Sequence, residues 1–149
     1  MTRLRTLVPT ACTDCPAYSR TFPCEPETAE IGRGFVRDAL AVWGLDDHHT
    51  DRATLIISEL IGNAAKHTSC HSVRLVVRRP SPAWVRVGVV DRAPRLVPEL
   101  HRAGVDDESG RGLLLIDSVA DRWGYDIRGP GRRPWGKEVW AELRTEADQ

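Results

Sequence analysis

The chain has 149 residues, a length that fits one domain with a hydrophobic core of its own. Hydrophobic residues make up 41% and charged residues 28%, which is ordinary for a soluble globular domain. The 21 basic and 21 acidic residues give a formal net charge of zero, which argues against a general binder of nucleic acid or of anionic membranes.

The N-terminal residues, 1–15, contain two arginines but no apolar run of the kind that a secretory signal needs. No stretch elsewhere approaches the roughly 18 apolar residues that cross a bilayer. We therefore expect a cytoplasmic protein that crosses no membrane and keeps its cysteines reduced. The irregular cysteine spacing favours thiols over a zinc site, although both interpretations stay open. The four residues concerned are Cys12, Cys15, Cys24 and Cys70.

In chain order, we predict an irregular segment over residues 1–17 and a single domain over residues 18–145. A strand over 19–24 leads to a helix over 26–43, whose first turn holds Pro26 and Glu27, whose apolar residues have helical spacing and which ends at Gly44. Asp46 or Asp47 is placed to cap a second helix that runs to about Thr68.

This second helix carries the most informative stretch of the chain, residues 54–68. At about 100° per residue, its apolar side chains fill one broad arc. Glu59, Asn63 and His67 follow at intervals of four residues, so they form a stripe along the edge of that arc. A carboxylate and a carboxamide are costly to bury there unless something polar binds them. The stripe is either a half-solvated helix edge or the wall of a pocket.

Two strands come next, over 72–79 and 83–91, and their short connection predicts an antiparallel hairpin. Asp91 ends the second strand, where it can accept hydrogen bonds from a ligand or from the following turn. A loop or lid over 96–109 leads into Gly110-Arg111-Gly112, which opens an apolar helix. The free N–H groups at such a helix start favour phosphate. A second hairpin, with strands over 123–128 and 136–143, completes the domain.

Four motifs therefore stand in one order: Glu-x-x-x-Asn on a helix, an aspartate closing a strand, Gly-x-Gly entering a helix, and Gly-Lys-Glu-Val-Trp on a final strand. This order resembles the GHKL nucleotide-binding domains of gyrase, heat-shock chaperones and sensor histidine kinases. Over about residues 19–143 it is most similar to the small bacterial anti-sigma-factor serine/threonine kinases. The resemblance implies a two-layer α/β sandwich, with helices on one face of a mixed, mostly antiparallel sheet.

The resemblance also implies ATP and Mg²⁺ as cofactors. Asn63 would hold Mg²⁺ through its carbonyl oxygen, a hard ligand for a hard cation. Glu59 would orient or deprotonate the attacking serine hydroxyl or water. Asp91 would accept a hydrogen bond from the adenine amine, with Ala93 beside the base. The rest of the expected cofactor-binding set consists of Lys66, His67, Gly110, Arg111, Gly112, Leu113 and Lys137.

The sequence departs from the family pattern at two motifs. The family's first glycine box is Asp-x-Gly-x-Gly, whereas both glycines are missing from the five residues that begin at Asp91. The last box often has threonine after the lysine, and here Glu138 stands in its place. An extra carboxylate near phosphates would repel them unless its side chain faces away.

From the resemblance we expect an ATP- and Mg²⁺-dependent protein serine kinase that acts as an anti-sigma-factor-type regulator. Its expected partner is a sigma factor, an anti-anti-sigma factor or both, with no nucleic acid; whether it forms a homodimer stays open. One alternative is a catalytically inactive nucleotide-binding adaptor or switch that sequesters a protein partner. Another is the catalytic part of a sensor kinase, which would need a second polypeptide.

Overall fold

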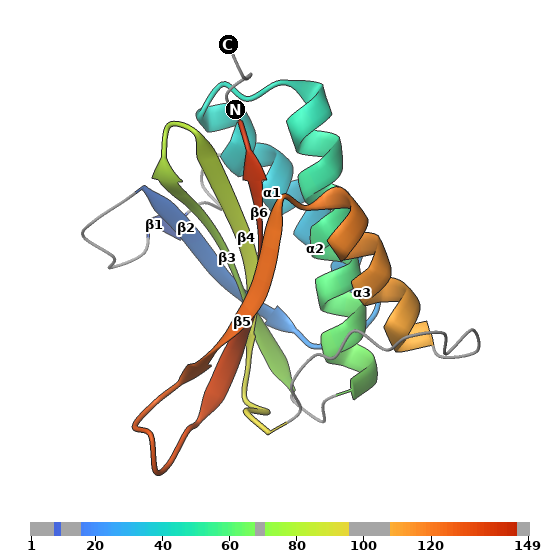
Figure 1. Cartoon of the computed structure of the whole chain (residues 1–149), viewed down its shortest axis with the longest axis vertical. Coiled ribbons are helices and arrows are strands. Elements are labelled where there is room, and N and C mark those ends of the chain that lie inside the picture. Colours follow the sequence, from blue (N-terminus) through green and yellow to red (C-terminus); the bar gives the residue numbers. More distant parts are fainter. Residues whose placement is uncertain (1–7, 10–15, 68–70, 96–107, 146–149) are drawn as a thin grey trace.

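The fold has two layers, with helices on one face of an antiparallel sheet (Figure 1). The structure is a computed structural model and describes residues 8–9, 16–67, 71–95 and 108–145. Within these residues the sheet has the strand order β1-β2-β3-β4-β6-β5, and each pairing is antiparallel. The predicted α/β sandwich with a mostly antiparallel sheet is confirmed, and the described strands contain no parallel pair.

The strands match the predicted hairpins closely. Their bounds are β1 (Val8–Pro9), β2 (Ala17–Pro23), β3 (Ser72–Ser81), β4 (Trp84–Asp91), β5 (Arg122–Arg128) and β6 (Gly136–Arg144). The short strand β1 lies in the segment that was predicted to be irregular and pairs with Tyr18 and Ser19 of β2. The last strand of the chain, β6, lies between β4 and β5, which makes it a central strand.

Three helices are described: α1 (Thr28–Val42), α2 (Asp47–His67) and α3 (Glu108–Val119). Gly44 ends α1 with a φ of 71°, and the backbone N–H groups of Gly44 and Leu45 donate to carbonyls of the last turn. Asp46 caps α2, because its Oδ1 accepts a 3.0 Å hydrogen bond from the backbone N–H of His49. None of the described helices has the length and apolarity that crossing a bilayer requires.

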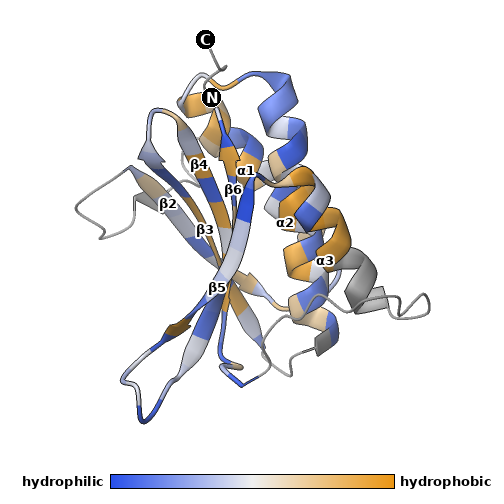
Figure 2. Cartoon of the chain, viewed as in Figure 1, coloured by the Kyte–Doolittle hydropathy of each residue, from blue (hydrophilic) through white to orange (hydrophobic). Residues whose placement is uncertain are grey.

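The hydrophobic core lies between the helices and the facing side of the sheet. Alternation along the strands sends every second side chain of β3 and β4 into this core. The apolar arc of α2 packs against them, as the sequence predicted, and Figure 2 shows hydrophobic segments along β3, β4, α2 and α3. The central members are Ile56, Ile57, Leu60, Ile61, Val73, Leu75, Val77, Val85, Val87 and Val89.

The helix that Gly110-Arg111-Gly112 is predicted to open starts two residues before the first glycine, at Glu108. Both glycines lie inside α3, near its start. The first four N–H groups of a helix generally lack intrahelical acceptors, and Gly110 lies in this first turn of α3. The loop or lid predicted over 96–109 lies outside the described residues, apart from its last two residues, which belong to α3.

Candidate functional site

A pocket of about 50 Å³ lies between α2 and the strands β4 and β6. Its lining residues are Leu60, Asn63, Ala64, Val89, Asp91, Lys137 and Val139. One water molecule needs roughly 10–15 Å³, so the pocket holds more than a single water. Its walls are largely apolar, and an amide, a carboxylate and an ammonium group reach it. A larger hollow of about 320 Å³ beside α1 contains none of the predicted site residues.

Asp91 and Lys137 form a buried ion pair at this pocket, with exposed fractions of only 3% and 2%. The two residues stand directly opposite each other on β4 and β6. Nζ of Lys137 lies 3.0 Å from Oδ1 and 2.9 Å from Oδ2 of Asp91, and it donates to the Ala93 carbonyl at 2.7 Å. The backbone N–H of Ala93 donates to Oδ1 of Asp91 at 2.8 Å. Asp91 thus both caps the following turn and reaches the pocket.

A glycine lets the two strands approach closely beside this pair. A Cβ atom added to Gly136 would lie far inside van der Waals contact with the carbonyl oxygen of Asp91. The residue before Lys137 therefore has to lack a side chain if Asp91 and Lys137 are to keep their register.

Of the polar stripe on α2, Asn63 lies at the pocket, as expected if the stripe forms a pocket wall. Asn63 is half-buried and lines the pocket one helical turn after Glu59. Glu59 is also half-buried, and within the described part of the chain its carboxylate has no hydrogen bond or ion pair. Lys66 is exposed, and the side chain of His67 lies outside what the structure describes.

The motif from Gly110 to Leu113 contributes differently at its two ends. Leu113 is 3% exposed and packs in the hydrophobic core, so its contacts are those of a core residue. Gly110, Arg111 and Gly112 lie in the first turns of α3, and their side-chain surroundings are outside the described set.

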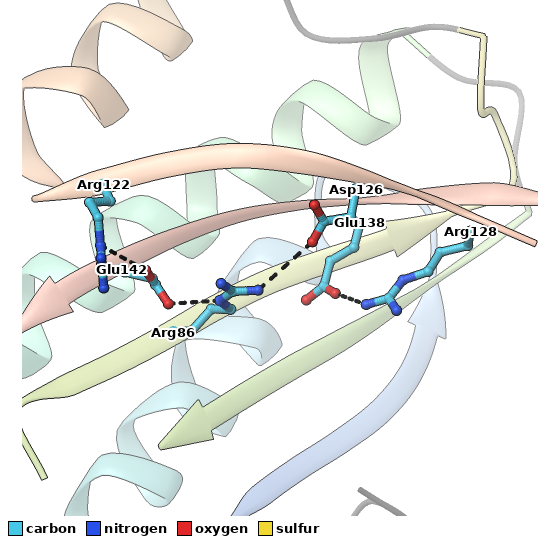
Figure 3. A network of polar contacts seen from close by, with 6 residues as sticks. All are labelled: Arg86, Arg122, Asp126, Arg128, Glu138 and Glu142. Atoms are coloured by element: carbon cyan, nitrogen blue, oxygen red, sulfur yellow. Dashed lines mark hydrogen bonds and ion pairs between the residues drawn. The ribbon is translucent and has the colours of Figure 1, made fainter. Parts of the chain in front are cut away.

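Glu138 points to the opposite face of the sheet from the pocket. Its side chain is fully buried there and contacts the guanidinium of Arg128 (Figure 3). Because successive side chains of a strand alternate between faces, Lys137 faces the pocket and Glu138 cannot. The repulsion of phosphates that a carboxylate at this position could cause is therefore removed.

Polar and aromatic side chains cover this outer face next to Glu138. Glu142 joins two arginines, with its Oε2 2.9 Å from Nε of Arg86 and its Oε1 3.0 Å from Nε of Arg122 (Figure 3). The guanidinium of Arg86 stacks 4.1 Å from the ring centroid of Trp140, and that of Arg122 lies 3.7 Å from Trp84. This network is separate from the pocket.

Two valines of the pocket, Val89 and Val139, were not among the predicted site residues. The signal for them is the two-residue period of a strand, because Val89 precedes Asp91 by two positions and Val139 follows Lys137 by two. Their contribution is apolar wall, which a motif of polar residues does not reveal.

The zinc hypothesis is not addressed by the described residues. Cys24 is half-buried, and Cys12, Cys15 and Cys70 lie outside the described residues. Among the residues that the structure describes, no group of three or more His, Cys, Asp or Glu is placed to hold a metal ion.

The pocket of about 50 Å³ is smaller than the roughly 300–1,000 Å³ of ligand sites, but the groups that line it are of the kinds that contact a nucleotide base and a metal. Apolar walls suit the faces of a flat base, and the buried carboxylate and ammonium suit the polar edge of that base. The amide oxygen of Asn63 is the kind of single hard ligand that suits Mg²⁺, which keeps most of its waters.

Comparisons with known proteins agree with this geometry. The histidine kinase-like ATPase domain family matches residues 22–142, which includes every described residue of the pocket. An uncharacterised protein of Streptomyces coelicolor is 48% identical over 81 residues, which cover 51% of this chain and 75% of that protein. The family implies ATP binding, typically together with Mg²⁺. The chain therefore belongs to the histidine kinase-like ATPase domain family.

Proposed function

We propose that this chain is an ATP- and Mg²⁺-dependent protein serine kinase that acts as an anti-sigma-factor-type regulator. The observation that carries the proposal is the meeting of Asn63 and Asp91 in one pocket, although they lie on different elements. The ordered motifs that resemble the small anti-sigma-factor kinases support the choice of a protein hydroxyl as the acceptor.

Each residue has a role that its chemistry allows. Asn63 would provide an oxygen ligand for Mg²⁺, and Asp91 would accept from the amine of the base. Glu59, half-buried and without a partner among the described residues, would orient the serine hydroxyl or take its proton. Gly110 would offer a backbone N–H to phosphate at the start of α3. Bound ATP with Mg²⁺ would supply the phosphoryl group and neutralise its charge.

The partner is proposed to be a sigma factor, an anti-anti-sigma factor or both. Binding of ATP would then be linked to capture of the sigma factor. Phosphorylation of a serine on the anti-anti-sigma factor would determine whether the sigma factor is released or retained. The second candidate, an inactive nucleotide-binding adaptor, is favoured by the missing glycines after Asp91, since Ala93 cannot adopt every glycine conformation.

Binding and transfer can be tested separately. We expect Asn63→Ala to lower the affinity for Mg·ATP at least about tenfold, as for loss of a metal ligand or its support, measured by isothermal titration calorimetry. Asp51→Ala, at an exposed position of the same helix, is the matched control and should bind like the wild type. Unchanged binding by Asn63→Ala would contradict the magnesium assignment.

Transfer is measured with γ-labelled ATP and purified candidate anti-anti-sigma proteins. We expect Glu59→Gln to bind Mg·ATP normally but to transfer label roughly 10²–10⁴ times more slowly, the usual loss for a general base. The exposed Glu30→Gln variant is the control. If the wild type binds ATP but labels none of the candidate proteins, and Glu59→Gln holds its partner equally well, the adaptor function is correct instead.

A further inference from the structure

The ion pair of Asp91 and Lys137 lies buried among apolar side chains at the wall of the pocket. Both charges are almost completely buried, and the next residues along the same face of their strands are Val89 and Val139. A buried ion pair is seldom more stabilising than apolar residues of similar volume. Since both charged groups reach the pocket, a ligand-facing role accounts for the pair better than packing does.

The two groups together still have hydrogen-bonding capacity for a ligand. Among the described residues, Oδ1 of Asp91 accepts from both Lys137 and Ala93, whereas Oδ2 accepts from Lys137 alone. The two oxygens of one carboxylate lie closer together, seen from Nζ of Lys137, than two N–H bonds of an ammonium can point, so a single N–H serves both of them. A second N–H donates to the Ala93 carbonyl, and the third is then left for a ligand. The pocket therefore offers one acceptor and one donor side by side.

We propose that Asp91 and Lys137 jointly read the edge of the nucleotide base, with Lys137 donating to a ring nitrogen while Asp91 accepts from the neighbouring amine. The inference rests on the proposed ATP binding. Adenine carries this combination, because its unprotonated N1 lies next to its 6-amino group. A base without the ring acceptor would leave a buried ammonium N–H unsatisfied, so Lys137 is a specificity-determining residue.

Ligand analogues test each half of the pair on the unchanged protein. In 1-deaza-ATP a C–H group replaces N1, and purine riboside triphosphate lacks the 6-amino group. We expect each analogue, titrated with Mg²⁺ into the wild type, to bind at least about tenfold more weakly than ATP, because each loses a hydrogen bond to a charged group.

Two variants separate recognition of the base from a merely structural role of Lys137. In Lys137→Met, ATP and 1-deaza-ATP should bind equally, while the penalty for purine riboside triphosphate remains because Asp91 is unchanged. Lys137→Gln keeps an N–H donor at similar length and should retain part of the 1-deaza-ATP penalty. If Lys137 had only a structural role, Lys137→Met would lower the affinity for all three nucleotides by the same factor.

The outcomes distinguish this inference from the function on which it rests. If the wild type binds ATP and 1-deaza-ATP equally, base reading by Lys137 is wrong and ATP binding stands. If the wild type binds none of the three nucleotides, ATP binding itself is wrong and the inference falls with it. Tighter ATP binding by Lys137→Met would show that the ammonium blocks the base, which also overturns the inference. Should Lys137→Met not fold, the wild type and Lys137→Gln decide the question.

Discussion

At the scale of single residues, Gly136 controls the distance between the strands that hold the ion pair. We expect Gly136→Ala to destabilise the fold by about 1–3 kcal/mol, because the new methyl group meets the Asp91 carbonyl and the strands must shift. Urea unfolding measures the change. Gly131→Ala is the matched control, since a Cβ there meets open space. Equal stability of the two variants would contradict the close approach.

The polar residues of the pocket could be predicted from sequence, but their pairing could not. Asn63, Asp91 and Lys137 each belong to a recognisable motif. That Lys137 stands opposite Asp91 depends on the register between β4 and β6, which are separated in the chain by α3 and β5. Local sequence does not determine such a register. The outward orientation of Glu138, in contrast, follows directly from strand alternation once its neighbour is known to face inward.

At the scale of elements, the start of α2 depends on one carboxylate. The hydrogen bond from the backbone N–H of His49 is the largest cause that lowers the pKa of Asp46 below its ordinary value of 3.8. A lowered folded-state pKa contributes stability above the unfolded pKa, and this contribution is lost as the pH falls through the folded-state value. We therefore expect Asp46→Ala to lower the Tm at pH 7, with a difference from wild type that shrinks under acid.

The Asp46→Asn variant is the control for charge. It keeps a capping oxygen, so its Tm at pH 7 should exceed that of Asp46→Ala, but it lacks a titrating carboxylate. Thermal unfolding followed by circular dichroism between pH 7 and pH 3 makes the comparison. A wild-type advantage over Asp46→Ala that is constant across this range would rule out the titration of Asp46 as its source.

Element types were more predictable than element starts. Alternation found both hairpins, and Gly44 with Asp46 marked the boundary between α1 and α2. The start of α3 lies two residues before Gly110, where the sequence placed it, because glycines have low helix propensity and mark a helix boundary, whereas in the fold they lie within the helix. The strand β1 was not predicted, because two residues give no periodic pattern. It is defined only by its pairing with β2.

At the scale of the whole molecule, helices cover one face of the sheet, and among the described residues the other face is covered by side chains of the strands themselves. Glu142, 4% exposed, connects arginines from β4 and β5 across β6 on that second face. We expect Glu142→Gln to destabilise the fold by about 1–3 kcal/mol, because two charge-assisted hydrogen bonds become neutral or are lost. Urea unfolding should show this loss, with ATP binding unchanged because the network lies opposite the pocket.

Glu25→Gln, at an exposed position before α1, is the control and should unfold like the wild type. Retention of full stability by Glu142→Gln would mean that its two ion pairs add nothing to the other contacts of Arg86 and Arg122, among them their aromatic stacking.

The position of the final strand also affects synthesis of the protein. A ribosome produces β5 before β6, yet among the described strands β5 pairs only with β6. A nascent chain that still lacks β6 can pair β2, β3 and β4 but cannot join β5 to them. Completion of the sheet must therefore wait until β6 has been made, and limited proteolysis of chains truncated before Gly136 should find β5 cleavable.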